Sequence, residues 1–107
     1  DYEARLAPLP GADSQSAGAT GKSEHERFAD GEVEFEVRAR GLVLPSGTEV
    51  EVRLNGVPVA TAPADGGPIA VALSLRKGDP VPSVRSGDRV ELMHRGRTLL
   101  EGTFAPE

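Results

Sequence analysis

Apolar and charged side chains alternate along several short stretches of the chain. The most regular stretch covers residues 48–60, TEVEVRLNGVPVA, in which valine and leucine alternate with glutamate and arginine before Asn55-Gly56. Because successive side chains of a strand point to opposite faces, this pattern predicts a strand with one apolar and one charged face. Asparagine and glycine tolerate the positive φ angles of a type I′ turn, so the stretch predicts a β-hairpin.

The same alternation recurs on both sides of this hairpin. In residues 32–40, EVEFEVRAR, the valines, Phe35 and Ala39 point one way, and the charged residues from Glu32 onward point outward. We expect residues 22–28 to pair with this strand. Further strands are expected at 1–10, 68–75, 88–94 and 97–104. Seven or eight short strands separated by turn signals, without helical periodicity, predict an all-β, antiparallel, immunoglobulin-like β-sandwich.

A weak internal repeat links two of the predicted hairpins. Residues 46–52, SGTEVEV, align with residues 86–92, SGDRVEL, and the turn glycines Gly56 and Gly96 keep the same offset of 40. The similarity is consistent with a duplicated hairpin, and equally with a common way of beginning a strand.

The first ten residues, DYEARLAPLP, form a separate amphipathic strand in this interpretation. Tyr2, Ala4 and Leu6 point to one face, and the prolines that follow end the strand. Residues 11–21, GADSQSAGATG, carry only small or polar side chains, which predicts a flexible tether without a buried face. Fully extended, a tether of this length reaches roughly 35 Å. Residues 22–107 are then the sandwich domain.

A strand on a long tether has several ways to complete a sheet. It can return to the sheet of its own chain, or it can enter the sheet of a neighbouring copy through backbone hydrogen bonds. Head-to-tail exchange does not close on itself and builds a filament, whereas mutual exchange closes a swapped dimer. The donor residues would be Tyr2, Ala4 and Leu6, and the acceptor groove would include Val71, Leu73 and Phe104.

Composition narrows the possible partners. The formal net charge of −5 and the sequence pI of about 5.0 argue against nucleic acid, whose phosphates require a basic face. The chain has no cysteine, which excludes disulfides and thiolate metal sites. No apolar run approaches the ~18 residues of a membrane helix. The ordered opening at Asp1 without a signal peptide is typical of a mature exported protein, so we expect an extracellular or cell-surface location.

None of the reactive side chains stands in a catalytic motif. His25 and His94 have no motif around them and are expected to be solvated at strand ends. Ser23, Ser46 and Ser86 lie in turn sequences without a nucleophile elbow. We therefore predict no enzyme activity, no cofactor and no resident metal.

The acidic residues also have a structural explanation. The aspartates of turns such as Asp30-Gly31 and Gly78-Asp79 lack the spacing of a calcium loop and are common turn formers. The strand glutamates are expected to face solvent and to pair across strands with arginines, rather than to act as an acid–base pair. This group comprises Glu32, Glu34, Glu36, Glu49 and Glu51, with Arg38, Arg40 and Arg53 as partners.

Two surface features concern carbohydrates. Tyr2 and the three phenylalanines are too few, and mostly core-facing, to build the aromatic platform of a sugar-binding site. The chain has no N-glycosylation sequon. Ser14, Ser16 and Thr20 in the tether are candidates for attached O-linked glycans, although a bare solvated linker is the simpler explanation.

Turn and core motifs follow one another in a recognisable order. They are Gly21-Lys22-Ser23, Val33–Val37, Gly41-Leu42, Gly47-Thr48, Asn55-Gly56, residues 78–82, residues 87–90 and Leu99–Phe104. In this order, residues 22–107 resemble a family of small immunoglobulin-like repeats of exported bacterial proteins and, more weakly, chordin-type (CHRD) domains. The resemblance implies a fold and transfers no catalytic residue. The layout of strand, tether and sandwich also resembles subunits of extracellular fibres that assemble by strand donation.

We therefore expect a structural subunit of an extracellular, pilus-like fibre, joined head-to-tail to identical copies by exchange of the N-terminal strand. The alternative is a monomeric, exported binding module of a surface protein, with a carbohydrate or protein ligand. Removal of residues 1–10 distinguishes the two, because only the fibre subunit would lose self-association.

Overall fold

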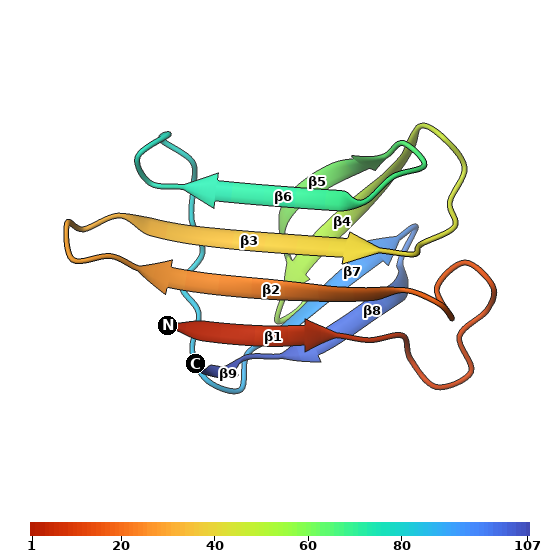
Figure 1. Cartoon of the computed structure of the whole chain (residues 1–107), viewed down its shortest axis with the longest axis horizontal. Helices are drawn as coiled ribbons and strands as arrows, with labels where there is room; N and C mark the ends of the chain where they lie inside the picture. Colours follow the sequence, from red (N-terminus) through yellow and green to blue (C-terminus); the bar gives the residue numbers. More distant parts are fainter.

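The computed structural model describes all 107 residues as two antiparallel β-sheets packed face to face (Figure 1). The chain has nine strands and no helix. The strands are β1 (Tyr2–Leu6), β2 (Thr20–Arg27), β3 (Val33–Arg40), β4 (Thr48–Leu54), β5 (Val57–Ala64), β6 (Ile69–Ser74), β7 (Arg89–His94), β8 (Arg97–Thr103) and β9 (Ala105–Pro106). Figure 1 shows the strands of the second sheet running obliquely behind those of the first.

The five-stranded sheet has the order β6-β3-β2-β1-β9, and the four-stranded sheet has the order β5-β4-β7-β8. The prediction of an all-β antiparallel sandwich is confirmed, whereas its immunoglobulin-like kind stays a prediction. The structure has one strand more than the seven or eight expected, because β9 has only two residues and is too short to show an alternating pattern. β9 brings the two chain ends together, where the Glu107 N–H donates to the Asp1 carbonyl over 3.1 Å (Figure 1).

The core lies between the sheets and is filled from alternate positions along the strands. On β3, Phe35 and Val37 are fully buried, and the residues between them point outward, as the alternation predicts. The largest side chains with less than 2% exposure are Phe35, Phe104, Leu92, Leu99 and Leu100. The ring centroids of Phe35 and Phe104 are 6.4 Å apart, within the range of favourable aromatic contact.

The Asn-Gly hairpin is confirmed, and its repeat lies beside it. Asn55 and Gly56 have φ angles of 51° and 81°, as a type I′ turn requires, and Arg95 and Gly96 have φ angles of 49° and 75°. The two hairpins, β4–β5 and β7–β8, pair through β4 and β7 within one sheet. Val52 lies opposite Leu92, its counterpart in the repeat, so an approximate two-fold axis relates the hairpins.

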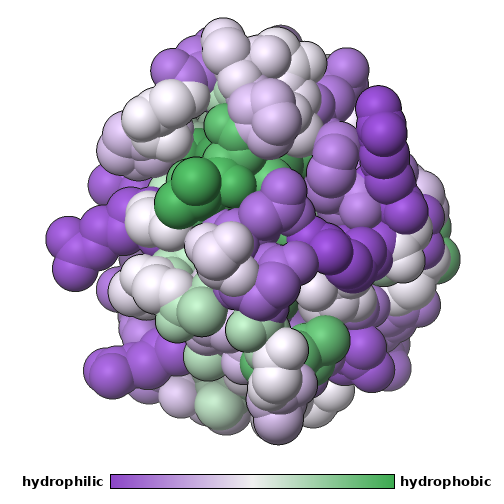
Figure 2. Space-filling view, turned by 90° about the vertical axis from the view of Figure 1, so that its right-hand side faces the viewer, coloured by the Kyte–Doolittle hydropathy of each residue, from purple (hydrophilic) through white to green (hydrophobic).

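The loops at the end of the sandwich away from the chain ends close the core incompletely. Leu42 and Leu44 pack against the core, whereas Val43 between them is 66% exposed. Figure 2 shows this end of the molecule, where apolar atoms come to the surface among polar side chains. The chain contains no helix that is long and apolar enough to cross a membrane.

Candidate functional site

The first strand, β1, lies inside the sheet of its own chain, between β2 and β9. Its five residues pair with β2 from Tyr2 opposite His25 to Leu6 opposite Gly21. Ala4 and Leu6 are 1% and 3% exposed, and the ring of Tyr2 is half-buried against the core. The three residues predicted to act as a donor face therefore point together into the core of this chain.

β8 meets β1 on the side that the short β9 leaves open. Ala7 and Glu101 exchange two backbone hydrogen bonds of 3.0 Å, which join the two sheets at this point. Gly102 makes the approach possible, because a Cβ atom at this position would lie 2.2 Å from the Arg5 carbonyl oxygen. Gly21 has a similar role on the other side, where a Cβ would lie 2.7 Å from the Arg38 carbonyl oxygen. We call these surroundings, formed by β2 with Gly21, β8 with Gly102, and β9, the seat of β1.

The structure brings only part of the predicted acceptor groove to this seat. Phe104 is 1% exposed and directly precedes β9, which pairs with β1. Val71 and Leu73 lie on β6, and β3 and β2 separate them from β1 in the sheet order. Sequence reasoning missed Gly21 and Gly102, although a glycine inside an alternating strand is a known sign of close backbone approach.

The segment between β1 and β2 is folded against the sandwich. Ser16 and Ala19 are each 4% exposed, and the Val43 N–H donates to the Gln15 carbonyl over 2.9 Å. The Arg97 guanidinium forms a 2.9 Å ion pair with Asp13. The prediction that residues 11–21 have no buried face is therefore wrong, and β2 begins at Thr20 rather than at the predicted Lys22.

The candidate glycan residues have different environments. Ser14 and Thr20 are exposed, whereas Ser16 is buried. A glycan on Ser16 would require this segment to open, so Ser14 and Thr20 remain the accessible candidates.

The two histidines do not form a pair, because His25 lies on β2 and His94 on β7, in different sheets. The prediction that both are solvated is wrong for His25, which is 2% exposed. Its Nε2 lies 3.1 Å from the Pro82 carbonyl oxygen, to which the ring donates. Burial lowers the pKa of His25 below its usual value, and the positive charge of Arg27 acts in the same direction, so the ring is neutral near pH 7. His94 stays at the surface, with Nδ1 3.2 Å from the Glu49 carbonyl oxygen.

The turn aspartates and Ser23 are occupied in local structure. Asp30, Asp79 and Asp88 accept hydrogen bonds of 2.8–3.0 Å from backbone N–H groups of Glu32, Ser74 and Arg85. These bonds lower the pKa of the Asp30 and Asp88 carboxyl groups. The Ser23 hydroxyl is fully buried and donates to the Glu36 carbonyl over 2.9 Å.

Glu32 differs from the other strand glutamates. It was predicted to face solvent, but it precedes β3 and is 8% exposed. Burial alone would raise the pKa of its carboxyl group. Hydrogen bonds from the Ser74 hydroxyl (2.8 Å) and from the Arg76 and Val33 N–H groups (3.0 and 2.9 Å) outweigh this effect, so the pKa of Glu32 is lowered. Glu32 therefore ties β3 to the end of β6.

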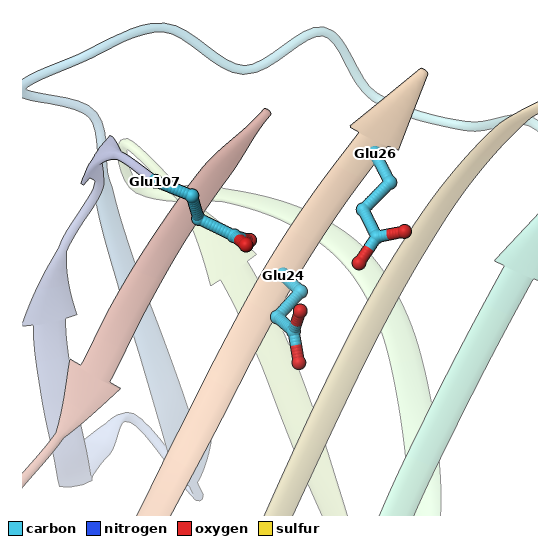
Figure 3. A group of neighbouring side chains, drawn as sticks. All are labelled: Glu24, Glu26 and Glu107. Carbon is cyan, nitrogen blue, oxygen red and sulfur yellow. The ribbon is translucent and has the colours of Figure 1, made fainter. Parts of the chain in front are cut away.

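The outer face of the five-stranded sheet carries the group of side chains in Figure 3. Glu24 and Glu26 project from β2, and Glu107 reaches toward them from the chain end, with one oxygen of each within 4.8 Å of the others. A hydrogen bond with Glu24 raises the pKa of Glu26, and nearby negative charges act in the same direction. Carboxylate oxygens suit hard cations such as Ca²⁺. The group is half-exposed, and no buried polar side-chain atom of the chain lacks a hydrogen-bond partner that a bound ion could supply.

Aromatic side chains form no platform on the surface. Phe35 and Phe104 are in the core, Tyr2 is half-buried, and Phe28 alone is exposed, at 43%. This arrangement does not favour stacking on a sugar ring. No protein-family model matches the chain, and no curated protein is significantly similar to it in sequence.

Proposed function

We propose that this chain is a non-enzymatic structural subunit of an extracellular assembly, and that exchange of β1 joins one copy to the next. The observation that carries the proposal is the position of β1. It supplies buried core residues, Ala4 and Leu6, yet a single segment, residues 7–19, connects it to the rest of the chain. Because β1 lies next to the chain end, it can leave the sandwich when only this segment opens.

The closed and the exchanged form share nearly all of their contacts. In both, β1 pairs with β2 and β9, packs against β8 and fills the same seat. The exchanged form loses only the contacts of residues 7–19, chiefly the burial of Ser16 and Ala19 and the ion pair of Arg97 with Asp13. Once open, these thirteen residues span up to roughly 43 Å, which allows β1 to enter a neighbouring copy.

The protein concentration determines which of the two forms is populated. A strand held by a short flexible segment has an effective concentration in the millimolar range at its own seat. The closed form is therefore favoured in dilute solution, and exchange is expected where copies are crowded or held side by side. Repeated head-to-tail exchange builds a filament when the rotation from one copy to the next does not close a ring.

Deletion of residues 1–10 tests the proposal. The truncated chain loses Leu6 from the core, and loss of a buried leucine alone costs about 2–5 kcal/mol, so the free energy of unfolding should fall sharply. A peptide with the sequence DYEARLAPLP should bind to the truncated chain and restore its stability, also when the two are refolded together from urea. Light scattering should show that the full chain forms oligomers at high concentration and that the truncated chain does not.

A truncated chain as stable as the full chain would contradict the proposal, and so would a peptide that restores no stability. A full chain that stays monomeric up to millimolar concentration, with glycans or a protein bound by the monomer, would favour the alternative of an exported binding module.

A further inference from the structure

The outer face of the five-stranded sheet has its charges sorted into rows across the strands. Residues directly opposite each other on β1, β2 and β3 carry the same sign. The five like-charge pairs are Glu3 with Glu24, Arg5 with Lys22, Lys22 with Arg38, Glu24 with Glu36, and Glu26 with Glu34. No directly opposite pair of β1, β2 and β3 on this face joins opposite charges. The prediction that the strand glutamates pair across strands with arginines is therefore wrong for Glu34 and Glu36, whereas Glu32 lies 3.7 Å from the guanidinium of Arg76, which follows β6.

Such rows weaken an isolated sheet. Like charges directly opposite each other are unfavourable, and a cross-strand pair is worth about 0.2–1 kcal/mol. The second sheet mixes the two signs: Glu91 lies opposite Glu101 on β8 but also opposite Arg53 on β4, and Arg89 bridges Glu91 and Glu101 at 3.0 and 3.2 Å. Rows of a single sign across three strands therefore occur only on the five-stranded sheet. This arrangement suggests that a partner molecule supplies the opposite charges for this face.

The ion pairs within the face are weak. Arg5 lies 3.7 Å from Glu3, Lys22 lies 3.2 Å from Glu24, and Arg38 lies 3.6 Å from Glu36. These three join residues two apart on one strand, whereas Lys22 also lies 3.6 Å from Glu3 across β2 and β1, and the three basic side chains are 51–91% exposed. Exposed pairs of this kind are worth about 0–1 kcal/mol, so their partners can be replaced easily.

The basic row lies at a hollow in this face. The hollow has a volume of about 570 Å³ and is lined by four basic residues, Arg5, Lys22, Arg38 and Arg40, and by one acidic residue, Glu3, beside Gly21. In a chain with a net charge of −5, this concentration of positive charge marks the place where carboxylates of a partner would be held.

We propose that this face stacks against the same face of a second copy, related by a two-fold axis that crosses the strands between the acidic and the basic row. The rotation reverses the strand direction and places residues at equal distances on the two sides of the axis over each other, on the same strand. Glu24 then lies over Lys22, and Glu36 over Arg38, of the other copy. Glu3 with Arg5, two positions apart, and Glu34 with Arg40, six positions apart, follow the same rule, and each pair forms twice, whereas Glu26 lies over Thr20 and gains no basic partner.

A second copy fits this face better than other partners. A metal ion would satisfy only the acidic rows, and a polyanion would satisfy only the basic row. The rotated copy offers both signs at the matching spacing. Stacked sheets lie about 10 Å apart, a gap that a glutamate and a lysine or arginine can bridge between them.

The size of the face predicts weak binding. Five strands spaced about 4.8 Å apart, with some seven residues of about 3.4 Å each, give roughly 550 Å² per copy. Stable interfaces bury about 800 Å² per partner, and this one is mainly polar. We therefore expect a dissociation constant in the micromolar to millimolar range. The contact does not depend on β1 exchange, because a β1 from a neighbour restores the same face.

Charge reversal in the full chain tests the stacking. Lys22→Glu with Arg38→Glu, and separately Glu24→Lys with Glu36→Lys, should each weaken self-association at least about tenfold, which corresponds to 1.4 kcal/mol. An equimolar mixture of the two double variants should restore it, since each pair is then opposite in sign again. Sedimentation velocity in 50 mM and 500 mM NaCl measures the association, which should weaken in high salt because exposed charges are screened.

Arg85→Glu with Arg95→Glu is the matched control, because both residues lie in exposed loops outside this face. It should leave association unchanged. The proposal is overturned if the mixture does not associate, if the control weakens association as much as the face variants, or if the wild type associates only with added Ca²⁺ and EDTA abolishes it. Because the mixture rescues two folded variants, misfolding of either one would not imitate the expected result. If the face variants lose stacking but copies of the chain still exchange β1, the proposed function is unaffected.

Discussion

Gly102 is the residue on which the position of β1 depends most directly. Any side chain there would collide with the Arg5 carbonyl, since a Cβ would lie only 2.2 Å from its oxygen. We expect Gly102→Ala to lower the free energy of unfolding by about 1–3 kcal/mol, the usual cost of overpacking. Urea unfolding measures the change.

Gly67→Ala is the control, because no atom lies within 4 Å of a Cβ built there. Its effect should stay within about 0.5 kcal/mol. Equal stability of both variants would show that β1 does not depend on close approach to β8.

His25 makes stability depend on pH. Its pKa is lowered in the folded chain, because burial disfavours the imidazolium, so the unfolded chain binds the proton first as pH falls. The stabilisation is fully present above the unfolded pKa of about 6.5 and is lost as pH decreases below it. We expect the free energy of unfolding to fall between pH 7.5 and 5.5 in the wild type, and this slope to be smaller in His25→Gln. A wild-type slope in His25→Gln would contradict the assignment.

Local chemistry made some residues predictable and left others hidden. Asn55-Gly56 was predicted because the turn needs two positive φ angles, which few residue pairs tolerate. His25 and Glu32 were misplaced because both stand among polar neighbours in the sequence. Their burial depends on the Pro82 carbonyl and on Ser74, which are 57 and 42 residues away along the chain. Alternation alone cannot reveal such distant partners.

The open edge of β6 shows how a strand without charged residues stays unpaired. The Leu75 N–H donates to Val33, so the even-numbered residues 70, 72 and 74 direct their backbone groups away from β3. Asp79 accepts from the Ser74 N–H at 3.0 Å and donates its own N–H to the Ser74 carbonyl, while the Lys77 ammonium caps the Ala72 carbonyl at 3.0 Å. Capping of this kind protects an edge from pairing with other chains.

Removal of the capping side chains of Lys77 and Asp79 should allow the edge of β6 to pair with other chains. We expect Lys77→Ala with Asp79→Ala to raise the rate of aggregation several-fold, because backbone groups of Ala72 and Ser74 become free to pair. Static light scattering at 37 °C measures the rate. Asp65→Ala with Arg95→Ala removes the same charges from other exposed turns and should aggregate like the wild type. Equal rates for the two double variants would show that the caps have no protective role.

For the secondary-structure elements, the sequence predicted which segments form strands better than it predicted which strands lie side by side. A period of two assigns each residue to a face, so Tyr2, Ala4 and Leu6 were recognised as one face. It does not say which strand lies alongside, and Val71 and Leu73 were therefore assigned to a groove that β3 and β2 separate from β1. The like-charge rows were missed for the same reason, because they appear only when the register of three strands is known.

For the whole molecule, the proposed assembly depends on whether β1 binds in its own chain or in a neighbouring copy. Engineered disulfides can record this, because the chain has no cysteine of its own. Glu3 on β1 lies opposite Glu24 on β2, and Cα atoms of opposite residues in antiparallel strands are about 4.5–5.5 Å apart, within disulfide range. Glu3→Cys with Glu24→Cys links β1 covalently to the sheet that receives it. The control, Glu91→Cys with Glu101→Cys, joins β7 to β8 within the second sheet.

The most direct measurement is a non-reducing gel of both variants, oxidised after partial unfolding in urea and refolding at millimolar concentration. Exchange of β1 should give a ladder of covalent dimers, trimers and longer chains for the β1–β2 pair, while the β7–β8 control remains monomeric. Monomers alone for both variants would contradict exchange of β1 and leave this strand a permanent part of its own chain.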